Sequence, residues 1–558
     1  MDRREFLTAR PKTRLTNPPA SKIFRSTSDL TPYTGAWNTA QLVHLLKRTM
    51  FGASKADIDY FKSKSLSETV DELLNPSAPL PSPPVKEYDP AGATNPDTDI
   101  LPGTTWVTHY HNDGNITSKR RASLKKWWTG LLVNQDRSIR EKMTLFWHNH
   151  FATEMVDVGD PQFIYKHNSL LRTNALGNFK ALTKAVTIDP CMLVYLNGNN
   201  STAGAPNENY ARELQELFVI GKENNPNYTE DDVKSAARVL TGWRTSSPNI
   251  SSSFDVARHD KTNKQFSSFY NNTVITGRNT TSAGDQEIDD MLNMLFSKKA
   301  EVSKFIVKKI YRWFCYYTID EKVQANVIDP LAQIFQNSNW EIKPVLDALF
   351  KSAHFYDAVN HGCLIKSPVD MVVSVCREFR IVFPNAATSY GDAYAMWEYV
   401  RNATATMNQN IGDPPSVAGW PPYYQVPQFH ELWINSDTLP KRNRFTDQLI
   451  GNGYTRNGFT LKIDPVAFAK TLSNPGNPNQ LIDDSLSILF QVPVSDESKQ
   501  AIKKQILLSG QLNDGYWSQA WTDYLANPAV KETPYQTVHN RLKDLFKYFL
   551  NMAEYQLS

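Results

Sequence analysis

A helical fold is indicated first by residues 138–153, which read SIREKMTLFWHNHFAT. Apolar or aromatic side chains at Met143, Phe146 and His150 follow the three- and four-residue spacing of a helix face that packs into a core. The same stretch places His148 and His150 among bulky apolar side chains. A buried imidazole needs partners for both ring nitrogens, which a metal, a carboxylate or a substrate can supply. These residues therefore predict a buried helix and a candidate site.

Helical periodicity recurs along most of the 558-residue chain. It predicts helices at 118–151, 162–188, 207–220, 229–241, 286–296, 300–317, 323–336, 342–350, 368–382 and 392–407. Between residues 251 and 273 Ser, Asn, Phe and Tyr replace this pattern, which predicts a β-hairpin or an irregular excursion. We therefore predict a mainly α, multi-helix globular array with a few short strands or a hairpin near 251–273.

Changes in composition divide the chain into four predicted parts. Residues 1–35 are polar and contain several prolines, which predicts an extended N-terminal arm. Residues 36–450 form the predicted helical core, interrupted by a Pro-rich loop at 75–104. Residues 451–479 are rich in Gly, Asn and Pro and predict a linker, after which 480–558 form a C-terminal helical region.

Composition and missing motifs exclude several functional classes. The net charge of +3 gives no indication of nucleic-acid binding by the protein as a whole. No run of about eighteen apolar residues occurs, so no membrane span is predicted. The four cysteines form no C-x-x-C pair, which argues against a zinc ribbon or a thioredoxin-like motif. The sequence also lacks a G-x-S-x-G elbow, a Walker phosphate loop, a dinucleotide-binding G-x-G-x-x-G and a zincin H-E-x-x-H.

The two histidines allow two interpretations. On a regular helix, residues two positions apart point in roughly opposite directions, so His148 and His150 would bind one ion only where the helix ends or unwinds. The alternative is that His150 is a hydrogen-bonded core residue and His148 a surface residue. The spacing alone does not decide between them.

A second candidate cluster lies at residues 207–218, where a helix carries several carboxylates on one side. Glu213 and Glu216 share a face, and Glu208 is four residues before Arg212, a favourable spacing for an ion pair. Adjacent carboxylates are costly unless cations, protons or a metal relieve their repulsion. Carboxylates three residues apart also build metal sites in helical bundles. The alternative is a solvated helix face.

A third candidate is the pair His259 and Asp260 in the irregular stretch, which could be a ligand pair, an acid–base pair or a turn. Together the three clusters predict a metal-dependent enzyme of unknown substrate. Its predicted metal ligands are His148, His150, Glu208, Glu213 and Glu216. Its predicted catalytic residues are Arg212, which would orient a carboxylate or bind an anionic substrate, and His259 and Asp260, as ligand or general base.

Mixed imidazole and carboxylate ligation suits a divalent or trivalent iron, manganese or zinc ion, and both redox and hydrolytic chemistry remain open. The alternative function is a non-catalytic binding or scaffold protein. In that case the aromatic residues and the loop at 414–420 would form a surface for a ligand or a partner.

The order of several motifs resembles a known family. These motifs are LLKRTMFG at 45–52, FWHNHFAT at 146–153, GNF at 177–179, DPCML at 189–193, NENYAREL at 207–214, LTGW at 240–243, KSP at 366–368 and PPSVAGW at 414–420. The chain is therefore similar to the domain-of-unknown-function 1800 family of bacterial proteins, over roughly residues 38–450. The family has no established reaction, so the resemblance implies none.

The resemblance also implies a partner and bears on localisation. Members of the family are often encoded beside the domain-of-unknown-function 1501 family, which is similar to sulfatases, so a sulfatase-like partner in the bacterial envelope is expected. Members often carry export signals, and Arg3-Arg4 resembles the start of a twin-arginine signal. The residues that follow are basic and polar instead of apolar. The compartment therefore stays open between the cytoplasm and, if the protein is exported as a passenger of its partner, the periplasm.

Overall fold

The computed structural model describes residues 26–222, 227–420, 432–528 and 533–558. The Arg3-Arg4 pair and most of the arm predicted at 1–35 lie outside the described residues. The described chain is mainly α, and three two-stranded antiparallel sheets are its β-structure. The mainly α fold class is thus confirmed.

The first half of the chain forms helices from Thr39 to Val239. They are α2 (Thr39–Thr49), α3 (Lys55–Phe61), α4 (Leu66–Leu73), α5 (Gly114–Val133), α6 (Arg140–His150), α7 (Met155–Val158), α8 (Pro161–Thr173), α9 (Phe179–Thr187), α10 (Pro190–Tyr195), α11 (Glu208–Glu213) and α12 (Glu230–Val239). A π-helical segment, η2 (Leu214–Val219), continues α11.

The second half is built in the same way. Its helices are α13 (Ala283–Ser297), α14 (Lys299–Phe314), α15 (Glu321–Val323), α16 (Asp329–Asn337), α17 (Ile342–Phe350), α18 (Pro368–Glu378), α19 (Tyr390–Thr406), α20 (Thr438–Ile450), α21 (Pro465–Lys470), α22 (Pro478–Leu489), α23 (Asp496–Ile502), α24 (Gly515–Ala526) and α25 (Thr533–Asn551). Short 3-10 or π segments are η1 (Gly198–Asn200), η3 (Ser268–Tyr270), η4 (Gln324–Ile328), η5 (Ala358–Asn360), η6 (Lys503–Leu507) and η7 (Ala553–Gln556).

The strands lie around the predicted irregular stretch and near residue 455. They are β1 (Trp243–Ser246) paired with β2 (Ser251–Phe254), β3 (Lys264–Gln265) with β4 (Val274–Ile275), and β5 (Tyr454–Arg456) with β6 (Phe459–Leu461). In the first hairpin Trp243 lies opposite Phe254. The predicted excursion at 251–273 therefore contains parts of two hairpins. The predicted linker at 451–479 contains β5, β6 and α21.

Two predicted long helices are each interrupted by asparagines that cap helix ends. The helix expected at 118–151 is divided into α5 and α6, because α5 ends at Asn134. The helix expected at 162–188 is divided into α8 and α9. There Asn174 ends α8, and the side chain of Asn178 accepts a hydrogen bond from the backbone N–H of Ala181 to start α9.

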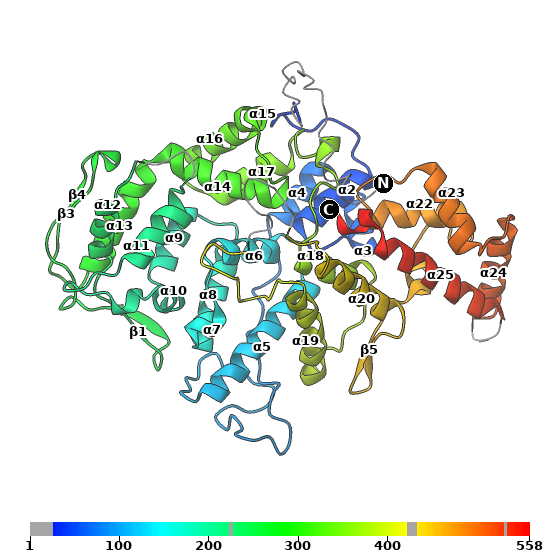
Figure 1. Cartoon of the computed structure of the whole chain (residues 1–558), viewed down its shortest axis with the longest axis horizontal. Coiled ribbons are helices and arrows are strands. Elements are labelled where there is room, and N and C mark those ends of the chain that lie inside the picture. The colour runs from blue at the N-terminus through cyan, green and yellow to red at the C-terminus, as the bar shows by residue number, and fades with distance from the viewer. Residues whose placement is uncertain (1–25, 223–226, 421–431, 529–532) are drawn as a thin grey trace, which may run out of the picture.

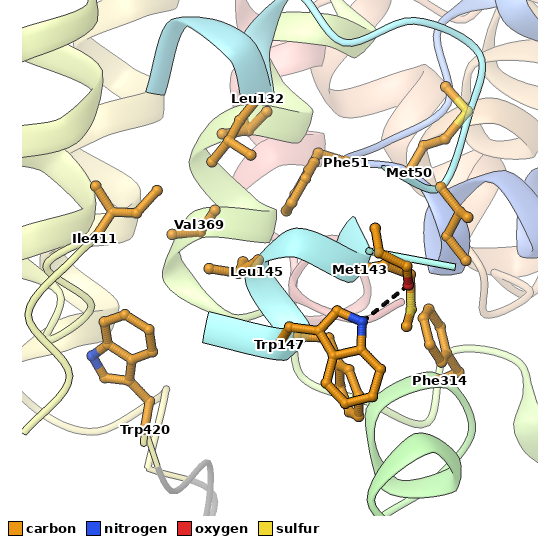
Figure 2. Packing of buried hydrophobic residues seen from close by; sticks show 14 of the residues in the cluster. Met50, Phe51, Leu132, Met143, Leu145, Trp147, Phe314, Val369, Ile411 and Trp420 are labelled. Atoms are coloured by element: carbon orange, nitrogen blue, oxygen red, sulfur yellow. Dashed lines mark hydrogen bonds between the residues drawn. The ribbon is translucent and has the colours of Figure 1, made fainter. Parts of the chain in front are cut away.

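Helix α6 lies near the middle of the molecule, between the part formed by α9–α13 with β1–β4 and the part formed by α22–α25 (Figure 1). Almost all of its side chains are buried, as expected of a helix that is surrounded by protein. Figure 2 shows Met143, Leu145 and Trp147 of α6 among Phe51, Phe314 and other apolar side chains from several elements. The Trp147 indole donates to the carbonyl of Ala175 at 3.0 Å. This packing fixes the orientation of both α6 histidines.

None of the described helices combines the length and the apolar character needed to cross a membrane.

Candidate metal centre

His150, at the end of α6, is held by groups that are not carboxylates. Its Nε2 lies 3.0 Å from the carbonyl oxygen of Phe218, and its Nδ1 lies 3.0 Å from the Nζ of Lys309. Burial, followed by the charge of Lys309, lowers the pKa of His150 well below its usual value, so the ring is neutral. Since Phe218 belongs to η2, His150 does meet the continuation of the glutamate-bearing helix, through a backbone carbonyl.

His148 is buried in a different environment. Its ring packs edge-on against Trp128, with ring centroids 5.1 Å apart, and lies 5.8 Å from the Trp420 ring. Its Nε2 is buried and has no hydrogen-bond partner among the described residues. Burial, followed by the nearby His167 and Lys125, lowers the pKa of His148 to about 3. His148 is therefore a neutral imidazole with an unused ring nitrogen.

Basic side chains pair with two of the three glutamates of α11 and η2, Glu208 and Glu216. Arg212 pairs with Glu208 at 3.1 Å and with Glu216 at 3.8 Å, and it also pairs with Glu230 of α12 at 2.7 Å. Burial and the charge of Glu216 raise the pKa of Glu213. Among the described residues, no hydrogen bond or ion pair joins these carboxylates to the two histidines of α6.

His259 and Asp260 belong to a separate network of buried charges. The Nε2 of His259 lies 3.1 Å from Glu287, and its Nδ1 lies 2.9 Å from the carbonyl of Thr241. Asp260 accepts from Arg238 at 2.7 Å. Burial acts to raise the pKa of Asp260, but the hydrogen bonds it accepts outweigh burial and lower the pKa to about 2. His259 thus contacts Glu287 of α13, and Asp260 contacts Arg238 of α12.

The structure brings together a different set of metal-binding side chains. One donor atom each from His167, Asp189 and Cys191 lies within 4.8 Å of the other two, and all three residues are buried. Among the described residues, no other group of three His, Cys, Asp or Glu residues has donor atoms this close together. We refer to these three residues as the candidate metal centre.

Local sequence explains how these three side chains meet. His167 lies on the buried face of α8, one turn from Phe163 and Ile164. Asp189 is the N-cap of α10, and its Oδ2 accepts from the backbone N–H of Met192 at 3.2 Å. Pro190 at the first helical position fixes the start of α10, and Cys191 follows it directly. Because α8 and α10 pack together, the imidazole faces the first turn of α10.

The hydrogen bonds of the centre leave one buried carboxylate oxygen of Asp189 unused. The Nδ1 of His167 lies 3.0 Å from Oδ2 of Asp189, and its Nε2 lies 3.2 Å from the carbonyl of Phe151. A neutral imidazole has one N–H and therefore donates to only one of these acceptors. The other carboxylate oxygen of Asp189, Oδ1, is buried without a partner among the described residues.

The donors fit a metal ion. With Nε2–H donating to Phe151, the Nδ1 lone pair of His167 faces Asp189, and a ligating histidine commonly donates its second N–H to a backbone carbonyl. Cys191 lies 3.7 Å from the hydroxyl of Thr153. Burial, followed by Asp189, raises the pKa of the Cys191 thiol well above its usual value, so its thiolate requires a cation.

The histidine motif thus contacts the centre through its last residues. Phe151 and Thr153 contact His167 and Cys191 through a carbonyl and a hydroxyl. None of these three donors belongs to the ligand set predicted from the sequence. The signals that could have found them are the D-P-C stretch at 189–191 and a histidine on the apolar face of a helix.

Comparisons with known proteins show a family without a known activity. A family model described as a protein of unknown function, DUF1800, matches residues 44–557, which is nearly the whole chain. No curated protein and no solved structure matches the chain.

Proposed function

The chain belongs to the DUF1800 family of proteins of unknown function, and from the geometry of the candidate metal centre we propose that it is a metal-dependent enzyme. The ion would be bound by His167, Asp189 and Cys191. The observation that carries this proposal is the meeting of three buried donors within 4.8 Å, one of which, Asp189, has a buried oxygen without a partner among the described residues.

The types of donor limit the choice of metal. Imidazole, carboxylate and thiolate together suit zinc or iron, whereas manganese prefers oxygen ligands. When bound, the ion would act as a Lewis acid or, if it is iron, as a redox centre. Proton release by the Cys191 thiol would accompany metal binding, because the ligand is the thiolate.

We further propose that His148 becomes a fourth donor after a movement of its side chain, because its ring nitrogens are not among the donor atoms that lie within 4.8 Å of one another. The contribution of His167 to the lowered pKa of His148 relates this residue of the sequence-predicted ligand set to the centre. Its ring is neutral, which is the form that binds metals, and its Nε2 is buried without a partner among the described residues. Phe151 and Thr153 would orient His167 and Cys191 and would not bind the ion.

The depth of burial favours a second candidate. His167, Asp189 and Cys191 are each at most 3 % exposed, and closed sites are typical of structural metals. In that case the protein would be a non-catalytic binding or scaffold protein, and the sulfatase-like partner expected from the family resemblance would supply the chemistry. Chelation separates the two functions. Removal of a structural ion lowers the unfolding temperature strongly, whereas removal of a catalytic ion abolishes activity with little effect on folding.

The metal itself is tested by elemental analysis of protein purified without an affinity tag. We expect about one zinc or iron ion per chain and a loss of at least tenfold in Cys191→Ala and His167→Ala. Cys376→Ala is a matched control, because it also removes a buried thiol but lies outside the centre. Cobalt(II) substitution should give a sulfur-to-metal absorption band that Cys191→Ala lacks. Metal-free wild-type protein, or equal metal content in Cys191→Ala and Cys376→Ala, would contradict the proposal.

A further inference from the structure

A cavity of about 570 Å³ lies beside α6 and is separate from the candidate metal centre. Its walls include residues of α2, α6 and α14 and of the segment before α18, and none of the three candidate metal ligands lines it. Five basic side chains line this cavity, namely Lys47, Arg48, Lys142, Lys309 and Arg312. Among its described lining residues, Asp370 is the one acidic side chain, and the last residue of the chain, Ser558, is also there.

Two of the basic residues already have carboxylate partners. Lys47 forms an ion pair with Glu378 at 3.0 Å and donates to the carbonyl of Leu489. Lys142 forms an ion pair with Asp370. The charges of these two lysines are therefore largely neutralised within the protein, and a ligand would compete with existing pairs to reach them.

Arg48 differs from both, because all its acceptors are neutral. Its guanidinium donates to the carbonyl of Asn360 at 2.9 Å, to the carbonyl of Cys315 at 3.4 Å and to the sulfur of Cys363 at 3.3 Å. The residue is 3 % exposed, and its Nε is buried without a partner among the described residues. No carboxylate of the described chain forms an ion pair with it. A buried charge without a counter-ion is energetically unfavourable.

Neighbouring residues respond to this charge. Burial, followed by Arg48, lowers the pKa of His361. His44, which stacks on His361 with ring centroids 4.1 Å apart, has its pKa lowered by burial, by His361 and by Arg48. Both imidazoles are therefore neutral, and among the described residues no carboxylate forms an ion pair with Arg48.

The remaining lining is rich in aromatic rings. Phe146, Trp313, Trp420 and Trp433 contribute flat apolar surfaces to the same cavity. Aromatic side chains provide large contact area for flat apolar groups, and polar groups placed among them select the orientation of a ligand. The cavity thus combines an uncompensated buried cation with surfaces suited to an apolar body.

We propose that this cavity binds an organic oxyanion, a carboxylate or a phosphate carried on a flat apolar body, with Arg48 as its counter-ion. Arginine matches the geometry of both anionic groups and forms paired hydrogen bonds with them. The inference does not depend on the metal centre, because the two sites share no residue. Loss of metal binding and loss of anion binding are therefore measured separately.

The test uses three naphthalene compounds and calorimetric titration of the full chain. 1-Naphthyl phosphate and 1-naphthoate distinguish the two anionic groups, and 1-naphthol is the neutral control. We expect at least one of the anions to bind ten or more times more tightly than 1-naphthol. Arg48→Met should abolish that preference. Arg377→Met is the control for loss of a buried arginine, because Arg377 pairs with Asp57 and does not line the cavity.

A pair of variants at Leu364 keeps the proposal testable if Arg48→Met does not fold. Leu364 is partly exposed and lines the cavity. Leu364→Glu should weaken anion binding at least tenfold relative to Leu364→Gln, since the two side chains differ mainly in charge. Equal affinity of these two variants would overturn the proposal. So would equal binding of the anions and 1-naphthol, or no binding of any of the three compounds.

Discussion

Buried basic side chains in this protein differ in whether a carboxylate neutralises them. Lys264 lies 2.5 Å from Glu287, and Lys47 lies 3.0 Å from Glu378, and both pairs are buried. Lys366 is also buried, but its Nζ has no hydrogen-bond partner among the described residues and lies 3.8 Å from the centre of the Tyr555 ring. Burial, followed by the charge of Lys47, lowers the pKa of Lys366 to about 7.

Replacing Lys366 by methionine should therefore stabilise the protein and change its pH dependence. An unfolded lysine keeps its proton up to its ordinary pKa of 10.5, whereas folded Lys366 loses it near pH 7. Between these values the unfolded state binds more protons, so stability rises with pH by up to about 1.4 kcal/mol per pH unit. We expect Lys366→Met to lack this rise and to be more stable than wild type at pH 7. Urea unfolding at pH 7 and pH 9.5 measures both effects, and an unchanged pH slope in the variant would show that Lys366 is charged when folded.

At the same scale, the sequence left the burial of one histidine open and did not reveal the contacts of either. The apolar spacing placed His150 in the core, where it lies, whereas one of the two interpretations placed His148 at the surface, and it is buried. The partners of His150 are a carbonyl at Phe218 and an amine at Lys309, which lie 68 and 159 residues away along the chain. Pattern and spacing carry no information on such distant partners. For the same reason, the sequence pattern did not reveal that His167, Asp189 and Cys191 meet in space.

At the scale of secondary structure, periodicity predicted where helices lie but not where they end. Ends are decided by single capping side chains, and α9 gives an example. The side chain of Asn178 accepts from the N–H of Ala181 at 3.1 Å. It also donates to the carbonyl of Asn339 at 2.7 Å and to Glu341 at 2.9 Å. Asn178 thus starts α9 and connects it to the segment before α17, which the periodicity of either helix does not reveal.

We expect Asn178→Ala to destabilise the protein by about 1–2 kcal/mol, because it removes an N-cap and two hydrogen bonds between elements. Asn115→Ala is the matched control. Asn115 is an exposed residue in the first turn of α5, for whose side chain no hydrogen bond is present among the described residues, so its replacement should change stability by less than about 0.5 kcal/mol. Chemical denaturation of both variants provides the comparison. Equal stabilities would mean that packing, not the cap, separates α8 from α9.

At the scale of the whole molecule, the C-terminal segment packs into the same core as the central helices. Helix α25 packs against α20 and α21, and the chain end pairs with the segment before α18 through Ile365 and Leu557. The hydroxyl of Tyr555 donates to Glu378 of α18 at 3.0 Å, deep in the core. The family match to residue 557 also includes this segment. The domain boundaries at 451–479 stay a prediction, and these contacts indicate how they can be tested.

Because Tyr555 joins the chain end to α18, its replacement should affect the stability of the whole protein. We expect wild type to unfold in one calorimetric transition. Tyr555→Ala should lower the temperature of that single transition and reduce the free energy of unfolding by about 3–5 kcal/mol, as for other buried aromatic residues. Tyr548→Ala is the control, since Tyr548 lies on the exposed side of α25 and is 44 % exposed. If residues 480–558 instead form an independent unit, the variant should show a separate early transition while the main transition stays in place. That result would support the linker predicted at 451–479 and contradict a common core.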